Sequence, residues 1–291
     1  MYVDPNLPRH LFGWQSPRLG LEMPIATYGE RGHPLLVFPR GAGDFLEAER
    51  GWLIKAIEPH IAAGRCRVFS IESISRHAWL NPEVTPAEAA RRQALYAAYV
   101  EEEVVPYIRS VTRRPDARIA VAGAEFGAFQ AANQLFRRPD LFDTLVAMSG
   151  FYDLEPEHAR GHWDDNLYFN NPVSYLAHMH DPRTLDLLRN HTQIHLLCGR
   201  GCGETPERSE QLARRLAEKD IPCTLDVGGE DVDAGWTWWG RMLSYTIGER
   251  LGWPATEAPS RPAPPAPPPP PPSAPSISPS GRREPPGARP R

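Results

Sequence analysis

The sequence predicts an α/β fold with a doubly wound, mostly parallel sheet. Short apolar runs of strand length recur along the chain and alternate with longer segments that carry helix signals. Most of these runs end in a loop that contains glycine or proline. The chain has 291 residues, a length that one α/β domain can reach.

The N-terminal third supplies the first strands of this sheet. Residues 1–20 are expected to form an irregular lead-in, and residues 22–28 a candidate edge strand. The compact apolar run at 35–38 predicts a buried strand that is followed by a glycine-containing loop. A helix is expected over 44–63, and the next strand over 66–71.

A strong helix start lies at Thr85, Pro86 and Glu88. Threonine can cap the helix, proline fits its first position, and glutamate fits the third. The apolar face of the helix that follows is predicted at Leu95, Tyr99, Val104 and Ile108.

The C-terminal half continues the alternation of strands and helices. Strands are predicted at 143–148, 193–198 and 223–227, and helices at 206–219, where Thr205 is the expected cap, and at 236–251. The segment 151–190 is expected to be an irregular insert, which can cover a site.

The most informative stretch is a sharp turn between a strand and a helix. An apolar run at 119–122 breaks into Gly123-Ala-Glu-Phe-Gly127, and a helix-forming segment follows at once. Glycines permit a strained, tight turn that lifts one side chain above the carboxyl edge of the sheet. The residue in the raised position is Glu125.

Several short motifs surround this turn in a characteristic order. Their order and spacing together resemble the α/β-hydrolase superfamily over roughly residues 20–252, and more closely its esterase family with esterase D-like and antigen 85-like members. The motifs are Val37-Phe-Pro39, Ala131-Ala-Asn133, Phe136-Arg-Arg-Pro-Asp140, Ser149-Gly-Phe-Tyr-Asp153, Tyr168-Phe-Asn-Asn-Pro172 and Gly229-Glu-Asp-Val-Asp-Ala-Gly-Trp236.

The resemblance implies a catalytic triad in the chain order serine, acid, histidine. Glu125 holds the serine position, and Ala234 holds the histidine position before the last helix. Glu204, in the loop after the strand at 193–198, is the candidate for the acid. The resemblance also implies an oxyanion hole formed by the backbone N–H groups of Phe126 and of the loop at Arg40 and Gly41.

Two replaced triad positions predict a catalytically inactive relative that binds an unidentified small molecule or protein. Loss of a triad member costs about 10⁶ in turnover, because the triad acts as a unit. The alternative is an active carboxylic ester hydrolase in which Glu125 activates water and Glu204 supports it. Glu125 as a nucleophile and a histidine of the insert, foremost His162, as a substitute base remain further alternatives.

Two structural hypotheses concern the charges around the turn. Glu125 and Arg40 are expected to pair and to close the old pocket from inside. A hard cation held by Glu125, Glu204, Asp231 and Asp233 is an alternative, although the site is expected to hold no metal and no cofactor. Trp236, Trp238 and Trp239 are expected to pack the last helix against the sheet.

Composition divides the chain into a domain over 1–253 and a proline-rich tail over 254–291. The tail holds 16 of the 33 prolines and almost no apolar residues other than alanine and proline, which predicts disorder. Its five arginines and two glutamates give the tail a net charge of +3. Because the net charge of the whole chain is −4, the domain carries a net charge of −7. A mildly acidic domain gives no reason to expect nucleic acid.

No apolar N-terminal segment or membrane-spanning run is visible, so a cytoplasmic protein without membrane contact is expected. The four cysteines are expected to be reduced, and they lie mostly in or beside apolar runs: Cys66, Cys198, Cys202 and Cys223. The sequence gives no indication of the oligomeric state.

Overall fold

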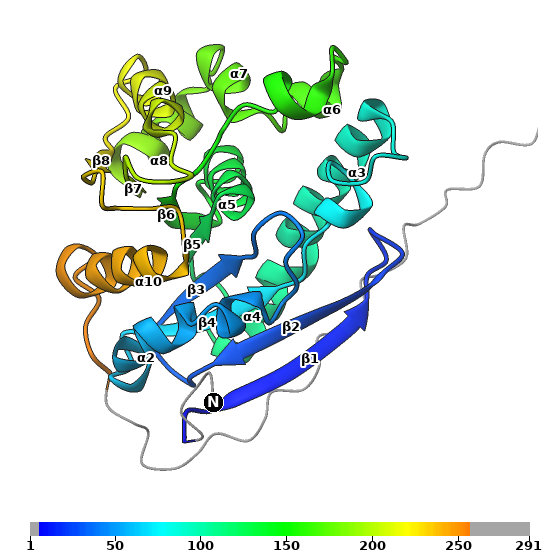
Figure 1. Cartoon of the computed structure of the whole chain (residues 1–291). Coiled ribbons are helices and arrows are strands. Elements are labelled where there is room, and N and C mark those ends of the chain that lie inside the picture. Colours follow the sequence, from blue (N-terminus) through cyan, green and yellow to red (C-terminus); the bar gives the residue numbers. More distant parts are fainter. Residues whose placement is uncertain (1–5, 257–291) are drawn as a thin grey trace, which may run out of the picture.

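The structure is a computed structural model that describes residues 6–256 (Figure 1). The predicted tail therefore lies outside the described residues from position 257 onward. Within the described range, one sheet runs through the molecule and helices cover both of its faces (Figure 1).

The sheet has eight strands in the order β1-β2-β4-β3-β5-β6-β7-β8. β1 and β2 are antiparallel to their neighbours, and the strands from β4 through β3 to β8 are parallel. The predicted fold class, a doubly wound and mostly parallel sheet, is confirmed. The strands are β1 (Arg9–Gln15), β2 (Glu22–Tyr28), β3 (His33–Phe38), β4 (Cys66–Ile71), β5 (Ile119–Ala124), β6 (Phe142–Met148), β7 (Gln193–Cys198) and β8 (Thr224–Val227).

The helices form two layers, one on each face of the sheet. α2 and α10 cover one face, and α3, α4, α5 and α9 cover the other. A π-helical turn (Val100–Val104) joins α3 to α4, and another (Thr246–Arg250) follows α10. The helices are α1 (Glu47–Arg50), α2 (Leu53–Ala62), α3 (Pro86–Tyr99), α4 (Val105–Thr112), α5 (Phe126–Arg137), α6 (Asp165–Tyr168), α7 (Pro172–Ala177), α8 (Pro182–Asn190), α9 (Pro206–Ala217) and α10 (Trp236–Tyr245).

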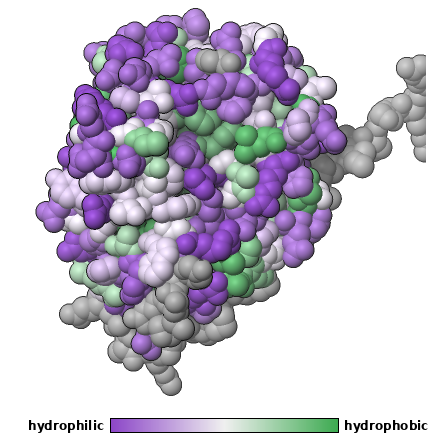
Figure 2. Space-filling view, viewed as in Figure 1, coloured by the Kyte–Doolittle hydropathy of each residue, from purple (hydrophilic) through white to green (hydrophobic). Residues whose placement is uncertain are grey.

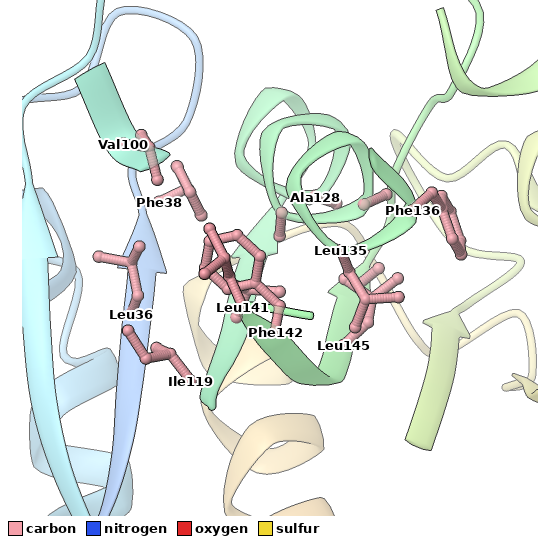
Figure 3. Packing of buried hydrophobic residues seen from close by; sticks show 14 of the residues in the cluster. Leu36, Phe38, Val100, Ile119, Ala128, Leu135, Phe136, Leu141, Phe142 and Leu145 are labelled. Atoms are coloured by element: carbon pink, nitrogen blue, oxygen red, sulfur yellow. The ribbon is translucent and has the colours of Figure 1, made fainter. Parts of the chain in front are cut away.

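The core follows from alternation along the central strands. In β5, Ile119 and Val121 point to the face that α5 covers, and Ala120 and Ala122 point to the face under α2 and α10. Figure 3 shows the first of these faces, where Ile119, Leu36 and Phe38 pack with side chains of α5. Both faces are buried, which explains why the central strands read as continuous apolar runs.

Three predictions about local structure were wrong. Residues 1–20 contain β1, whose side chains are mostly exposed and therefore carry no apolar alternation. The helix expected over 44–63 is interrupted at Trp52, which has a φ of 65°. The insert at 151–190 is not irregular, since it holds α6, α7 and α8.

Of the two helix caps predicted at threonine residues, one is present and one is absent. The Thr85 side chain accepts a hydrogen bond from the Glu88 N–H at 3.3 Å, as its position before α3 predicts. Thr205 makes no such side-chain cap before α9, so that cap was wrong.

An ion pair at the amino edge of the sheet predicts a pH dependence of stability. His33 Nε2 lies 3.2 Å from Asp143 Oδ1, and the His33 ring stacks on Trp253 at 4.6 Å. Burial raises the pKa of the Asp143 carboxyl, but the hydrogen bond and charge of His33 outweigh it, so the net pKa is lowered.

A lowered pKa means that the charged carboxylate stabilises the folded state above its unfolded pKa of about 4. That stabilisation disappears as the pH falls through the folded pKa. We expect Asp143→Asn to lower the free energy of unfolding by about 1 kcal/mol at pH 7 and the difference from the parent to shrink below pH about 4. Urea unfolding across this pH range measures it, and a difference that stays constant with pH would contradict the assignment.

Candidate functional site

The turn between β5 and α5 has the geometry that the sequence predicts. Glu125 has φ 51° and ψ −114°, a conformation that is rare for a residue with a side chain. A Cβ on Gly123 would lie 2.3 Å from the Gly127 carbonyl carbon, and one on Gly127 would lie 2.5 Å from the Phe38 oxygen. The two glycines therefore allow the close approach that raises Glu125 above the carboxyl edge of the sheet.

A cleft of about 600 Å³ lies at this edge, and Glu125 is part of its wall. The Glu125 side chain is 42% exposed. Figure 2 shows apolar surface set among polar surface on one face of the molecule. The cleft combines both kinds of side chain, and those used below are Arg40, Glu125, Phe126, Phe151, His158 and Arg208.

Arg40 is held in place beside Glu125. Its Nη1 lies 3.6 Å from Glu125 Oε2, and its Nε donates to Glu47 Oε1 at 3.2 Å. The guanidinium also lies over the rings of Trp236 and Trp239, 5.2 and 5.6 Å from their centroids. The predicted ion pair is therefore present, but the expected closure is wrong, because the cleft stays open and Glu125 stays exposed.

One of the candidate oxyanion-hole donors is already bonded. The backbone N–H of Arg40 donates to Glu47 Oε2 at 2.8 Å, so this group is not free for a substrate oxygen. Phe126 and Gly41 also line the cleft. The sequence predicts Glu47 only as part of a helix start. Its contact with Arg40 was not predicted, because the only indication in the sequence is that the two residues lie seven positions apart.

Glu204 lies in the loop after β7, where the resemblance places the catalytic acid. Its Oε1 accepts a hydrogen bond from Ser149 Oγ at 2.6 Å, and Ser149 Oγ accepts one from Trp239 Nε1 at 2.8 Å. Burial raises the pKa of the Glu204 carboxyl; the Ser149 hydrogen bond opposes this, while the charge of Glu125 adds to it. Glu204 Oε2 is buried and has no hydrogen-bond partner.

Ala234 lies against the same loop. Its N–H donates to the Cys202 carbonyl at 3.0 Å, and a Cβ on Gly203 would lie 3.3 Å from its methyl group. Asp233 Oδ1 accepts a hydrogen bond from the Cys202 N–H at 2.7 Å, which fastens the loop before α10 to the loop after β7. Position 234 is thereby held beside the Glu204 loop.

The histidine of the insert that reaches the cleft is His158. Its ring lies 5.5 Å from that of Phe126 and 5.4 Å from that of Phe151, and burial lowers its pKa. His162 instead pairs with Asp164 at 3.1 Å and does not line the cleft, so the choice of His162 was wrong. Both residues follow β6 in irregular sequence, and no local pattern distinguishes them.

The structure gives no support to the cation alternative. Within residues 6–256, no group of three or more His, Cys, Asp or Glu side chains is arranged to hold a metal ion. Asp233 is bonded to the Cys202 N–H instead. The four cysteines are free thiols; Cys66 and Cys198 are buried, and Cys202 is exposed. No helix in the described part of the chain is long and apolar enough to cross a membrane.

Solved structures of esterases share this fold. A ferulic acid esterase is 20% identical with a TM-score of 0.63, over 83% of this chain and 96% of its own. S-formylglutathione hydrolase from Agrobacterium tumefaciens is 15% identical with a TM-score of 0.61, over 86% and 98%. MPT51 of Mycobacterium tuberculosis is 15% identical with a TM-score of 0.60, over 84% and 98%. At these identities the likeness shows the fold alone.

The sequence itself matches a family model. No curated protein matches the chain. The model described as "Putative esterase" matches residues 70–244, which include the turn at Glu125, the Glu204 loop and the segment before α10. With its fold and this match over more than half of its length, the chain belongs to that esterase family of α/β-hydrolase proteins.

Proposed function

We propose that the protein binds a small molecule in the cleft at Glu125 and does not hydrolyse esters. The observation that carries the proposal is a carboxylate, Glu125, on the turn where the resemblance places a serine nucleophile. The cleft remains open beside it. A site that has an open cleft and no serine nucleophile is suited to binding a ligand without reacting with it.

The residues around Glu125 do not supply the acid and the base that an ester hydrolase requires. Glu204 accepts its short hydrogen bond from Ser149 and not from an imidazole. Ala234 has no proton to transfer, and the ring contacts of His158 are to aromatic side chains. A nucleophile without a base to activate it and to release the acyl group gives no turnover.

The cleft offers contacts for an aromatic or apolar group next to a polar end. Phe126 and Phe151 form an edge-to-face pair at 5.2 Å, and Arg208 lies 5.9 Å from the Phe151 ring. Ring faces of this kind bind apolar and aromatic groups. The paired charges of Arg40 and Glu125 line the cleft, where Glu125 can accept and Arg40 can donate a hydrogen bond to a polar ligand group.

A second candidate is an ester hydrolase in which Glu125 activates water. It is favoured by the 42% exposure of the Glu125 side chain, since a general base must reach solvent. The raised pKa of Glu204 also fits a carboxyl that could hold a proton nearby. Against it, Arg40 Nη1 lies 3.6 Å from Glu125 Oε2 and competes with an attacking water for the carboxylate.

Hydrolysis of p-nitrophenyl acetate and butyrate separates the two candidates. We expect the parent, Glu125→Ala and Glu125→Gln to release nitrophenol at the same rate within about twofold, because no step depends on the carboxylate. Arg214→Ala, a change at a side chain that is 66% exposed and does not line the cleft, serves as the surface control. A loss of about 10²-fold or more in both Glu125 variants, with the control unchanged, would establish the general-base alternative.

A further inference from the structure

A second concave surface lies between α2 and α10, away from Glu125. This groove has a volume of about 720 Å³. It is lined by the aromatic residues Trp52, Trp236 and Tyr245 and by the small residues Gly51, Ala56 and Gly240. Trp52 and Tyr245 are 53% and 52% exposed, although burial of such rings is strongly favourable.

The two helices run in the same direction along this groove (Figure 1). A Cβ on Gly51 would meet the Trp236 ring at 2.2 Å, and one on Gly240 would meet the Ala56 methyl at 2.8 Å. Further along, His60 Nε2 lies 3.1 Å from Ser244 Oγ. Small residues therefore let the helix backbones approach, and the aromatic side chains rise on both sides of a long, narrow seam.

Trp52 is presented outward by an unusual backbone conformation. Its φ of 65° lies in the left-handed region, which costs a residue with a side chain roughly 1 kcal/mol or more. The break between α1 and α2 at this residue turns a large aromatic group toward solvent beside the seam. A strained backbone that exposes an aromatic ring is an observation that points to a binding role.

The polar groups of the groove are hydrogen-bond donors. Lys55, Arg241, Thr237 and Ser244 line it, and none of its described lining residues is acidic. A run of prolines has carbonyl acceptors and no N–H donors. It forms a polyproline II helix, and such segments bind in grooves lined by aromatic side chains. The groove thus has the chemistry that a proline-rich segment requires.

The chain carries such a segment, and it starts at the far end of the same seam. Thr256, the last described residue, donates its N–H to the Ala63 carbonyl at 3.1 Å, just after α2. Ala56 lies seven residues earlier in the sequence, about 11 Å away along the helix axis. Residues 262–281 are uncharged and include six consecutive prolines at 267–272. The six residue-to-residue steps from Thr256 to Pro262 span up to about 19 Å, so the tether reaches the groove.

We propose that the groove between α2 and α10 binds the chain's own proline-rich segment, residues 262–272. The tether gives the segment a local concentration in the millimolar range, so even weak contacts fill the groove. Trp236 lines the groove, and the Arg40 guanidinium, which lines the cleft at Glu125, lies over the same ring at 5.2 Å from its centroid. A segment bound in the groove therefore contacts a side chain that also supports Arg40.

The test uses full-length chains labelled with 5-fluorotryptophan and followed by ¹⁹F NMR. Trp52→Phe identifies the Trp52 resonance. The comparison is between the parent and a variant with Pro267→Ser and the same change at the five prolines that follow. We expect the Trp52 resonance to move in the variant, and a synthetic peptide of residues 262–274 to return it to the parent position.

The peptide should bind the variant at least about tenfold more tightly than the parent, whose groove is already filled. Tyr245→Ala in the variant background should weaken binding of the peptide. Phe169→Ala, which changes a similarly exposed aromatic residue outside the groove, should leave peptide binding unchanged. No shift and no response to the peptide would overturn the proposal. So would equal binding to both chains, which indicates a partner's segment, or a shift that depends on protein concentration, which indicates a second copy.

Discussion

The double variant Glu125→Ser/Ala234→His is expected to hydrolyse p-nitrophenyl acetate at least about 10²-fold faster than the parent protein. This expected gain is far below the roughly 10⁶-fold rate contribution of a complete triad, because the introduced side chains are not held in the best geometry for reaction. Steady-state release of nitrophenol measures it. This gain of activity is the largest effect that the structure predicts.

The structure explains why these two changes suffice for a start. Position 125 already has the raised conformation of the turn, and position 234 lies beside the Glu204 loop. Glu204 Oε2 is buried without a hydrogen-bond partner, and Oε1 accepts a hydrogen bond from Ser149. We expect an imidazole at position 234 to donate its N–H to Oε2.

The controls separate a triad from a general rise in reactivity. Glu125→Ala/Ala234→His has the histidine without the nucleophile, and Glu125→Ser has the serine without the base. Both should stay within about threefold of the parent, because either partner alone lacks the unit's function. A folded double variant that is no faster than these controls would show that the site has lost more than two residues.

The second large effect concerns the glycines that enclose Glu125. We expect Gly127→Ala to lower the free energy of unfolding by about 3 kcal/mol or more. Alanine would gain about 1 kcal/mol in helix propensity. Its Cβ, however, would lie 2.5 Å from the Phe38 oxygen and 2.8 Å from the Pro39 oxygen. Both are backbone atoms, at the last residue of β3 and at the residue that follows it, and they cannot move aside without disturbing the sheet.

Thermal unfolding is the measurement for this effect. A loss of 3 kcal/mol corresponds to about 6–12 °C in Tm for a domain of this size. Gly235→Ala is the matched control, because a Cβ there meets no atom within 4 Å and its φ of 175° is ordinary extended backbone. If both alanine variants unfold at the same temperature, the close packing at the turn does not restrain Glu125.

Glu125 has a strained backbone conformation at the sharp turn. A residue with a side chain in this conformation costs about 1–3 kcal/mol. Gly123 and Gly127 pack so closely that the backbone has no room to relax. The turn is therefore imposed by the packing of β5 on α5 and is independent of the chemistry of residue 125.

The sequence was sufficient for the parts of the fold that depend on local pattern. β4 and β7 were predicted with their observed ends, because buried strands of a parallel sheet are continuous apolar runs. The turn at Glu125 was predictable because it requires glycines at fixed positions. The carboxyl edge then follows from the topology, since parallel strands all end there.

Features that depend on contacts between distant segments were not predictable. β1 is an edge strand whose partner, β2, supplies the hydrogen bonds, and its own side chains show no buried face. The interruption at Trp52 arises where Trp236 of α10 packs against Gly51. The roles of Glu47 and His158 follow from where their elements meet the cleft, which no local pattern records.

One measurement tests the central claim, that the cleft binds ligands without ester hydrolysis. Saturation-transfer difference NMR of methyl 3-phenylpropanoate reports binding and conversion in the same sample. We expect saturation transfer to the phenyl protons, a weaker transfer in Phe151→Ala, and no release of methanol above the protein-free sample. Release of methanol that stops in Glu125→Ala would contradict the claim and make Glu125 a catalytic residue.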